Sequence, residues 1–496
     1  EIRNDAGEWQ TVSWDAALDR AAELLRHAPA EEIGCLVSPR ATNEELYLAQ
    51  KITRDLGSQN IDHRLRQVDF SDQEAAPLAP GMGLPIKELA QADGILLIGS
   101  NIRHEQPILG HKVRQAWREG ARVAAINPVD YKFHFDLTAQ AVGTPFEMLG
   151  VLAAAVKASG GKLPTGVKAL AADGVEKAVA DLLDKAERGV VIFGHTAAAH
   201  PRAGTLRLLA RRLAEQTGAA FCEPPASANT AGAWRLGVLP HRGPGGRAID
   251  PIGLNVREMV EQARSAYLVH DFEPGADSLY GPAMRKALAA ARTVYLGAFD
   301  TEEIRSFADV ILPLAVAPEV DGSLTNADGE SQTFLAAGTP PGDARAGWKV
   351  LRVLGNALAL QGFEYTRIEQ VRAEYEEILA AADEPPAKTF KPEPVKVPEG
   401  LQVVADLPIY ATDGLVRRAG ALQETAHGLE PEVRLAAEDA RDAGLKEGDQ
   451  ARVNIGDDRL VLRVSIDPRI AAGSVWLPAG VVAFDATAVT CTLGEG

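Results

Sequence analysis

Short apolar runs alternate with amphipathic segments through the first three-quarters of the chain. Each run is rich in β-branched and aliphatic residues and is bounded by glycine, proline or polar positions. The runs cover residues 33–38, 94–98, 122–126, 190–193, 266–270, 293–297 and 310–312. Between them, apolar residues recur every three to four positions, the period of a helix. This alternation predicts an α/β fold in which helices connect buried strands of parallel sheets.

Polar residues mark the beginnings of several predicted helices. Ser13 precedes an amphipathic segment that begins at Trp14 and is placed to cap it. Thr42 is followed three residues later by Glu45, the spacing of a capping box, and we expect that helix to end at Gly57.

The pattern changes after a proline-rich stretch. Five prolines, Pro385, Pro386, Pro392, Pro394 and Pro398, predict an extended linker. Beyond it, residues 452–455 and 459–466 alternate between apolar and polar positions around a Gly-Asp-Asp turn, as in a β-hairpin. We therefore expect a β domain from about residue 400.

The order of these patterns predicts the domain organisation. With 496 residues, two to four domains are expected. We expect residues 1–68 and 189–345 to form one discontinuous α/β domain, with residues 69–188 inserted in it as a second. Residues 346–400 then form helices and the linker, and residues 401–496 form a β-barrel.

Two loops carry candidate chemistry because each follows a predicted parallel strand, where open α/β sheets bind ligands. The first is Gly99-Ser100-Asn101, whose backbone amides are suited to an anion. The chain contains no GxGxxG dinucleotide fingerprint. The second is residues 319–329, which follow the run 310–312 and are punctuated by Asp-Gly and Asn turn formers.

Composition and charge narrow the possible functions. Hydrophobic residues make up 46% and charged residues 24% of the chain, as in a globular protein. The net charge of -17 argues against nucleic acid or anionic lipid as a partner. No apolar run approaches the ~20 residues of a membrane span. Cys35, Cys222 and Cys491 lie far apart without a CxxC motif, so we expect buried thiols rather than a cysteine-built cluster or zinc site.

One stretch resembles a known family. The sequence Ala308-Asp-Val-Ile-Leu-Pro, followed by Glu319 and by Asp321-Gly-Ser-Leu-Thr-Asn-Ala-Asp-Gly, is similar to the signature loop of the molybdopterin oxidoreductases. Segments 12–18, 92–128, 438–449 and 472–478 resemble the same family in the same order. The resemblance implies two parallel-sheet α/β domains and a C-terminal barrel that covers a dinucleotide arm of the cofactor. It also places six residues beside the pterin: Gly99, Ser100, Asn101, Glu319, Gly322 and Asn326.

The segment 58–70 departs from the catalytic members of that family. Those members carry a molybdenum ligand in this loop, usually cysteine, and the matching position here is Val68. Asp69, the next residue, is a carboxylate that would supply an oxygen ligand if the register were shifted by one. We expect His63 and its neighbouring arginines to form a solvated basic rim.

This departure resembles one branch of the family, the G subunits of bacterial NADH:quinone oxidoreductase (respiratory complex I). That resemblance implies a vestigial pterin site, with no catalytic residue, metal or cofactor in this chain. The 2Fe–2S and 4Fe–4S clusters would lie in a part of the protein before Glu1, since the chain does not begin with methionine. Partners would be other peripheral-arm subunits, on the cytoplasmic side of the inner membrane, without nucleic acid and without membrane insertion. Two alternatives remain: an active molybdenum enzyme similar to formate dehydrogenase, with Asp69 or water on the metal, and a nucleotide-binding protein that uses residues 99–101.

Overall fold

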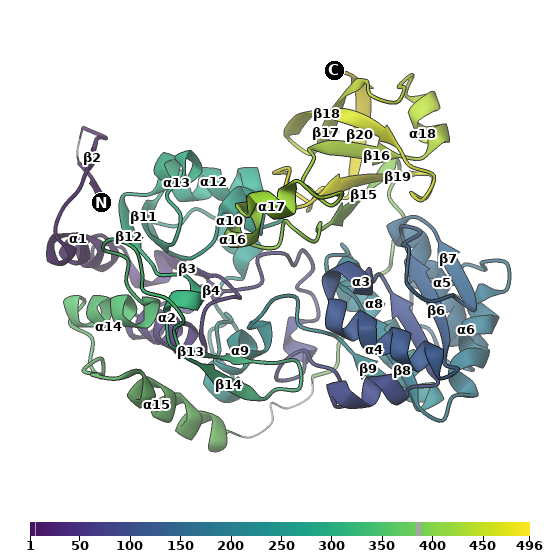
Figure 1. Ribbon diagram of the computed structural model, residues 1–496, viewed down its shortest axis with the longest axis horizontal. Coiled ribbons are helices and arrows are strands. Elements are labelled where there is room, and N and C mark those ends of the chain that lie inside the picture. The colour runs from purple at the N-terminus through teal and green to yellow at the C-terminus, as the bar shows by residue number, and fades with distance from the viewer. Residues whose placement is uncertain (5, 383–387) are drawn as a thin grey trace. The chain divides into compact units, whose positions relative to one another are not determined.

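The computed structural model describes residues 1–4, 6–382 and 388–496, which form two compact units (Figure 1). Unit 1 contains Glu1–Leu65, Ala76–Pro80 and Ser227–Ala387. Unit 2 contains Arg66–Ala75, Gly81–Ala226 and Lys388–Gly496. The chain therefore passes between the units several times, and each unit is described by itself.

Unit 1 is built on a seven-stranded sheet with the strand order β2-β1-β12-β11-β10-β3-β4. Its strands are β1 (Ile2–Arg3), β2 (Trp9–Gln10), β3 (Ile33–Val37), β4 (Ile61–Asp62), β10 (Ala266–His270), β11 (Arg292–Gly297) and β12 (Val310–Pro313). The five strands from β4 to β12 run parallel, and β1 pairs antiparallel with both β12 and β2. The parallel sheet predicted from the apolar runs is confirmed.

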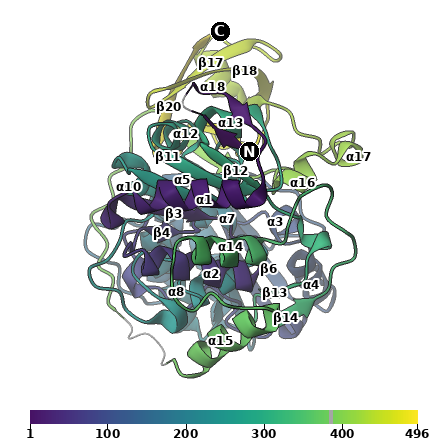
Figure 2. The same cartoon turned by 90° about the vertical axis from the view of Figure 1, so that its left-hand side faces the viewer.

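Helices cover this sheet and bury its side chains. They are α1 (Trp14–Arg26), α2 (Asn43–Asp55), α9 (Thr230–Arg235), α10 (Val256–Glu261), α11 (Pro274–Asp277), α12 (Gly281–Ala289), α13 (Glu302–Phe307), α14 (Gly347–Ala357) and α15 (Ile368–Ala380). Short 3-10 turns occupy Ala30–Glu32, Pro244–Gly246 and Ala317–Glu319. Helix α14 contacts both α1 and α2, as the view of Figure 2 shows. The predicted caps are confirmed: Ala16 N donates to Ser13 Oγ at 3.3 Å, and Thr42 with Glu45 forms the capping box.

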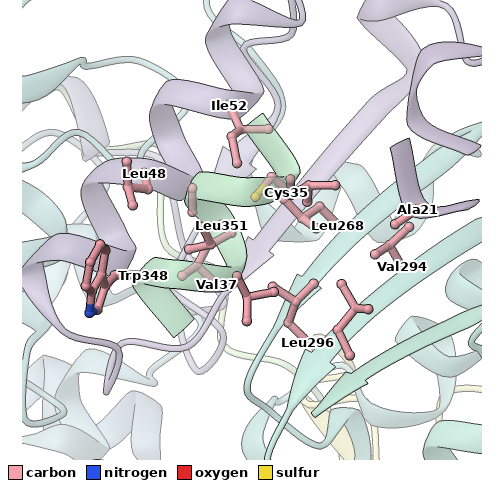
Figure 3. Packing of buried hydrophobic residues seen from close by; sticks show 14 of the residues in the cluster. Ala21, Cys35, Val37, Leu48, Ile52, Leu268, Val294, Leu296, Trp348 and Leu351 are labelled. Atoms are coloured by element: carbon pink, nitrogen blue, oxygen red, sulfur yellow. The ribbon is translucent and has the colours of Figure 1, made fainter. Parts of the chain in front are cut away.

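The core of unit 1 lies between the sheet and these helices (Figure 3). Cys35, Val37, Leu268, Val294 and Leu296 project from β3, β10 and β11 and are buried. They pack in one cluster with side chains of α1, α2 and α14, among them Ala21, Leu48, Ile52, Trp348 and Leu351. Burial of this apolar surface fixes which face of each helix turns toward the sheet.

The signature segment continues beyond β12 as a hairpin. We expected a polar loop, but residues 322–334 form β13 (Gly322–Thr325) and β14 (Ser331–Phe334), which pair antiparallel. The turn formers between them make the connection, as their residue types suggest. The hairpin is a separate two-stranded sheet and not an extension of the seven-stranded one.

Unit 2 contains a five-stranded parallel sheet with the order β7-β6-β5-β8-β9. Its strands are β5 (Gly94–Ile98), β6 (Arg122–Asn127), β7 (Ala139–Val142), β8 (Gly189–Phe193) and β9 (Ala220–Cys222). Its helices are α3 (Ile102–Glu105), α4 (Pro107–Arg118), α5 (Pro145–Ala158), α6 (Val175–Asp184), α7 (His195–Ala198) and α8 (Ala203–Thr217), with 3-10 turns at Gln73–Ala75 and Ile86–Gln91. The chain builds the sheet outward from β5 in one direction and then resumes at β8 on the other side of β5. This reversal is a topological switch point, where such sheets bind ligands.

The rest of unit 2 is a closed six-stranded barrel, as expected. Its order is β15-β19-β16-β18-β17-β20, formed by β15 (Leu401–Asp406), β16 (Glu432–Leu435), β17 (Gln450–Ile455), β18 (Asp458–Ile466), β19 (Ser474–Pro478) and β20 (Thr490–Glu495). Three short helices, α16 (Gly414–Arg417), α17 (Gly420–Gln423) and α18 (Ala437–Asp442), lie in its connections. Val129 and Tyr131, which follow β6, pack with Val404, Ile470 and Trp476 of the barrel.

One predicted domain boundary is wrong. We placed residues 189–226 with the first α/β domain, but β8 pairs with β5, with Gly189 opposite Gly94. Residues 81–226 therefore belong together in unit 2. A fully apolar strand presents the same pattern in either sheet, so its partner strand is chosen by tertiary packing rather than by periodicity. The two α/β sheets themselves are separate, as predicted.

The proline-rich linker is only partly described. Pro385 and Pro386 lie outside the described residues. Pro392, Pro394 and Pro398 lie in a stretch without helix or strand, as expected of a linker. Across the described part of the chain, we find no helix long and apolar enough to cross a bilayer.

Candidate functional site

In unit 1, the hairpin of the signature segment is bonded to the beginning of helix α2. Ser323 donates twice to the Glu44 carboxylate, from its backbone N at 3.0 Å and from Oγ at 2.9 Å. The Thr325 N–H donates to Asn229 Oδ1 at 2.8 Å, and Thr325 Oγ1 donates to Asn43 Oδ1 at 3.2 Å. These bonds are buried and link the hairpin, helix α2 and the loop before α9 into one polar network.

Glu44 is the centre of this network, and sequence reasoning missed its role. Its side chain is fully buried, and Arg372 Nη2 of α15 balances its charge at 2.8 Å. Tyr375 Oη lies 2.9 Å from Ser323 Oγ and extends the network to α15. The one sequence signal was an acidic residue in the first turn of a helix, which by itself indicates only a favourable interaction with the helix dipole.

Three of the six predicted cofactor residues lie in this region, and each has a structural role. Gly322 lets the hairpin approach α2, because a Cβ there would stand 2.6 Å from Thr42 Cγ2. Asn326 Oδ1 accepts from the backbone N–H groups of Asp328 and Glu330, both at 2.9 Å, which holds the turn of the hairpin. Glu319 Oε2 accepts from Val316 N at 3.1 Å within its own turn.

The segment that matches the metal-binding loop begins with a buried ion pair. Asp62 Oδ1 and Oδ2 accept from Arg64 Nε and Nη2, both at 2.8 Å. The Arg64 guanidinium holds the pKa of Asp62 below its usual value although burial opposes this. Asp62 Oδ2 also accepts from Val256 N at 3.1 Å. The pair is therefore part of the internal structure of unit 1.

The predicted basic rim is wrong for His63 and Arg64. His63 is 1% exposed and Arg64 is 6% exposed, so neither side chain faces solvent. His63 Nδ1 lies 2.8 Å from the Val238 carbonyl oxygen, and the Arg64 guanidinium stands over the Trp234 ring, 5.5 Å from its centroid. Charged and polar residue types in a loop indicated solvent exposure, but the carboxylate of Asp62 offsets the cost of burying this arginine.

Val68 and Asp69 lie in unit 2. Val68 offers no ligand atom. Asp69, the candidate substitute, caps the beginning of helix α8, because its Oδ2 accepts from Gly204 N at 2.9 Å. Its Oδ1 accepts from Ser71 N at 3.0 Å. Both carboxylate oxygens are thus engaged by backbone amides.

The other three predicted cofactor residues lie at the switch point of the five-stranded sheet. Gly99 has a φ of +50° and packs tightly on α7, since a Cβ would stand 2.5 Å from Ala197 N. The Ser100 N–H donates to Asn127 Oδ1 at the end of β6, at 2.8 Å. The Asn101 N–H donates to Glu105 Oε1 at 3.0 Å. These three consecutive residues follow β5 at the switch point between β5 and β8.

Glu105, which the sequence analysis did not single out, closes this arrangement. Its Oε2 accepts from the His195 N–H after β8 at 3.1 Å and from Ser100 Oγ at 3.5 Å. Burial raises the pKa of Glu105 to about 8, and the nearby Asp406 contributes in the same direction, whereas the bonds from Asn101 and His195 lower it. The Glu105 carboxyl therefore links the loop after β5 to the loop after β8 by accepting a hydrogen bond from each.

The barrel of unit 2 adds a second buried acid near these loops. Asp406, at the end of β15, accepts at Oδ2 from Tyr131 Oη at 3.2 Å and from Trp476 Nε1 at 3.1 Å. Burial raises the pKa of Asp406. A cavity of about 20 Å³ lies between the barrel and the loops, lined by Pro128, Pro145, Met148, Thr196, Ala199, His200, Pro201, Val403, Val404, Ala405, Ala486 and Val489. That volume holds about one water molecule.

The thiols match the sequence expectation. Cys35, Cys222 and Cys491 are free and buried. Burial raises the pKa of Cys35 and of Cys491 to about 12, and that of Cys222 further, which keeps the thiolate form rare. Among residues 1–4, 6–382 and 388–496, no three His, Cys, Asp or Glu side chains converge in an arrangement that suits a metal ion.

The residues present do not fit a molybdopterin cofactor. In unit 1, the polar atoms of the signature hairpin named above bond within the unit. In unit 2, a carboxyl group accepts the amides at the switch point, and Asp69 caps a helix. A bound pterin dinucleotide needs donors for its phosphates and a ligand for its metal. The amides of Asn101 and His195 and both oxygens of Asp69 already have protein partners, and Val68 has no ligand atom.

Comparison with known proteins agrees with this fold. The family model described as molybdopterin oxidoreductase matches residues 1–357, and that of the molybdopterin dinucleotide binding domain matches residues 413–493. Among solved structures, acetylene hydratase from Pelobacter acetylenicus superposes with a TM-score of 0.60 at 16% identity, covering 97% of this chain and 83% of that one. At that identity the likeness shows the fold alone, and it confirms the predicted fold class.

Two kinds of curated relative are similar to this chain. The G subunit of NADH-quinone oxidoreductase from Streptomyces coelicolor is 30% identical over 536 residues, which covers 96% of this chain and 60% of the relative. The alpha subunit of an F420-dependent formate dehydrogenase of Methanocaldococcus jannaschii is 25% identical over 430 residues, covering 75% of this chain and 63% of that protein. The chain thus spans about three-fifths of the length of these relatives.

Proposed function

The chain belongs to the molybdopterin oxidoreductase family, and we propose that within it the chain is the cofactor-free module of the G subunit of an NADH:quinone oxidoreductase. In this role it supplies structure and interfaces rather than catalytic residues. The single observation that carries the proposal is that polar groups of its cofactor loops bond within the chain, as Glu105 does at the switch point. Similarity to the Streptomyces coelicolor relative over 96% of the chain supports it.

The proposal assigns electron transfer to a part of the protein outside this chain. The whole subunit would pass electrons from NADH toward quinone through 2Fe–2S and 4Fe–4S clusters that this chain does not hold. Its partners would be other peripheral-arm subunits on the cytoplasmic side of the bacterial inner membrane. Iron–sulfur clusters are held by cysteine thiolates. The three cysteines of this chain are buried and far apart in sequence, which supports placing the clusters in another part of the protein.

The alternative function is that of an active molybdenum oxidoreductase. The formate dehydrogenase relative favours it, and so does the presence of Asp69 next to the matched ligand position. Molybdenum accepts an oxygen ligand where thiolate is lacking, so an aspartate is chemically suitable. Against it stand the two backbone amides that Asp69 accepts, because metal ligation would compete with the cap of helix α8.

Elemental analysis separates the two functions. The chain is purified from cells grown with molybdate or tungstate, and its metal content is measured by mass spectrometry beside a formate dehydrogenase prepared in the same way. We expect background molybdenum and tungsten in this chain and stoichiometric metal in the control. Stoichiometric metal in this chain that falls away in an Asp69→Ala variant would establish the alternative.

The interface role has its own test. A specific interface buries on the order of 1,000 Å² or more and survives affinity capture. We expect the tagged chain to recover peripheral-arm subunits, or the iron–sulfur part of its own subunit, from extracts of the source cells. Recovery of none of these under conditions that capture a full-length G subunit would contradict the proposed role.

A further inference from the structure

The switch point of the five-stranded sheet has the geometry of a ligand crevice. The loops after β5 and β8 diverge there, one leading to α3 and the other to α7. Backbone N–H groups of Asn101 and His195, from these two loops, converge on one small volume. Converging amides at the carboxyl ends of parallel strands are the usual receptor for a phosphate or carboxylate group.

The group in that volume belongs to the chain itself. The two oxygens of the Glu105 carboxyl divide the donors between them, Asn101 N to Oε1 at 3.0 Å and His195 N to Oε2 at 3.1 Å. Glu105 is the last residue of the four-residue helix α3, so only three residues separate it from Asn101, which supplies the first donor. The Ser100 hydroxyl supplies a third, longer contact at 3.5 Å.

We propose that the Glu105 carboxyl is a permanent internal ligand of this crevice, and that it excludes the anionic group of any external ligand from the switch point. A phosphate would need the same two amides, and both are taken. The proposal rests on the proposed function, because the same two bonds of Glu105 support both, and it goes further in assigning the exclusion of external anions to this one carboxyl.

Charges of both signs surround the crevice. Asp406 adds a second acid, which together with burial raises the pKa of Glu105. Arg66 lies near His195, and Arg103 and Arg469 lie near His104. Burial lowers the pKa of both His195 and the nearby His104 to about 4, so these imidazoles are neutral near pH 7. A cation does face Asp406, the Arg434 guanidinium, which lowers the pKa of that carboxyl. Arg434 also lies 3.8 Å from Asp467, so its charge is shared between acids.

The barrel limits access from the other side. Tyr131 and Trp476 donate to Asp406, and Tyr131 Oη lies 3.5 Å from Thr196 Oγ1, the residue after His195. The cavity of about 20 Å³ lies beside Thr196, and its lining does not include Glu105, Asn101 or His195.

Chemical rescue tests the proposal. Glu105→Ala leaves the two amides without an acceptor, and we expect its Tm to fall by about 4 °C or more. Formate, a carboxylate small enough to fit the space of the CH2–COO⁻ group removed, should raise the Tm of this variant with concentration relative to equal chloride. It should also protect residues 99–106 and 194–199 from hydrogen exchange. The wild-type chain should respond equally to formate and chloride, and should show no protection by pyrophosphate or guanosine diphosphate.

Two further variants make the result decisive. Glu119→Ala, an exposed glutamate at the end of α4, should change neither the Tm nor the response to formate. Glu105→Gln keeps the size of the side chain but turns one acceptor of the ionised carboxylate into a donor. At pH 9, above the Glu105 pKa of about 8, we therefore expect faster exchange of the His195 amide in this variant than in the wild type, even if Glu105→Ala fails to fold. The proposal is overturned if pyrophosphate or guanosine diphosphate protects residues 99–106 in the wild type, if Glu105→Gln exchanges as the wild type does, or if a folded Glu105→Ala shows either an unchanged Tm or no rescue by formate.

Discussion

At the scale of single residues, two buried carboxylates in unit 1 are each matched to an arginine of the same unit. Asp62 faces Arg64, and Glu44 faces Arg372, with one fully buried carboxylate in each pair. Removing one partner of such a pair costs about 3–5 kcal/mol because the other charge is left buried alone. These residues are therefore structural constraints, although their types are those of a binding loop.

His63 gives the pH dependence that follows from this burial. Burial lowers the pKa of His63 to about 4, below the ordinary value near 6.5. Between pH 4 and 6.5, the imidazole therefore takes up a proton when the protein unfolds. The contribution of neutral His63 to the free energy of unfolding is fully present above pH 6.5 and is lost as the pH falls toward 4. We expect His63→Asn, which keeps a donor for Val238, to reduce the slope of unfolding free energy against pH by about 1.4 kcal/mol per pH unit in this window.

Denaturant unfolding between about pH 4.5 and 7 measures this slope. The half-buried His104 and His195 and the buried His200 also carry pKa values lowered to about 4, so the variant should keep part of the acid sensitivity. His27→Asn, at an exposed position after α1, is the matched control and should leave the slope unchanged. An unaltered slope in His63→Asn would show that this imidazole is not held neutral.

At the scale of elements, the signature segment is a hairpin that packs on the beginning of α2. Its sequence contains turn formers and small polar residues, which are as suitable for a ligand loop as for this packing. The contact explains why Gly322 must lack a side chain, since Thr42 Cγ2 and Phe334 Cζ lie 2.6 and 3.0 Å from the Cβ position. A close approach between elements therefore accounts for this residue without a cofactor.

A pair of substitutions tests this packing. Gly322→Ala should lower the free energy of unfolding by about 1–3 kcal/mol, as overpacking does. Thr42→Ser removes Cγ2 but keeps the hydroxyl that accepts from Glu45 N in the capping box. We expect the double variant Gly322→Ala with Thr42→Ser to be more stable than Gly322→Ala alone in thermal unfolding. A double variant less stable by the sum of the two single effects would show that the two side chains do not collide.

At the scale of the whole molecule, the chain forms two units that are each assembled from several segments. The linker of residues 388–398 joins unit 2, where Val395 N donates to Gly166 O at 3.2 Å and the Val395 side chain packs against the core of the five-stranded sheet. Lys388 at the beginning of that stretch pairs with Glu74, but its side chain is 60% exposed. The linker is thus packed against unit 2 at Val395 and exposed to solvent at Lys388.

Limited proteolysis should reflect this difference. We expect cleavage within residues 385–398, as a proline-rich linker suggests, and trypsin should cut first after Lys388. Lys396 follows the held residue Val395 and should be cut later, and Lys391 precedes proline and should resist. Intact mass measurement over time identifies the fragments. First cuts inside 94–222, or a stretch 388–398 that stays intact while other loops are cut, would contradict this organisation.

The sequence by itself determined the local structure and the family. Apolar runs predicted the strands, Ser13 and the pair Thr42–Glu45 predicted helix beginnings, and residues 308–329 identified the family, because these signals act over a few residues along the chain. It also brought Gly99, Ser100 and Asn101 to the end of a strand, where parallel strands place their ligand loops.

Only the tertiary structure decided which groups meet. Three features join residues that are distant in sequence. Strand β8 pairs with β5, and Glu44 pairs with Ser323 and Arg372. His63 is buried by segments that come much later in the chain. Glu105 is four residues from Asn101, yet its second partner, the His195 amide, comes 90 residues later. The spacing of apolar residues along the chain indicates which face of a helix or strand is apolar, but not which other element packs against that face. For this reason the sequence predicted where the crevice lies, and only the tertiary structure showed that the Glu105 carboxyl fills it.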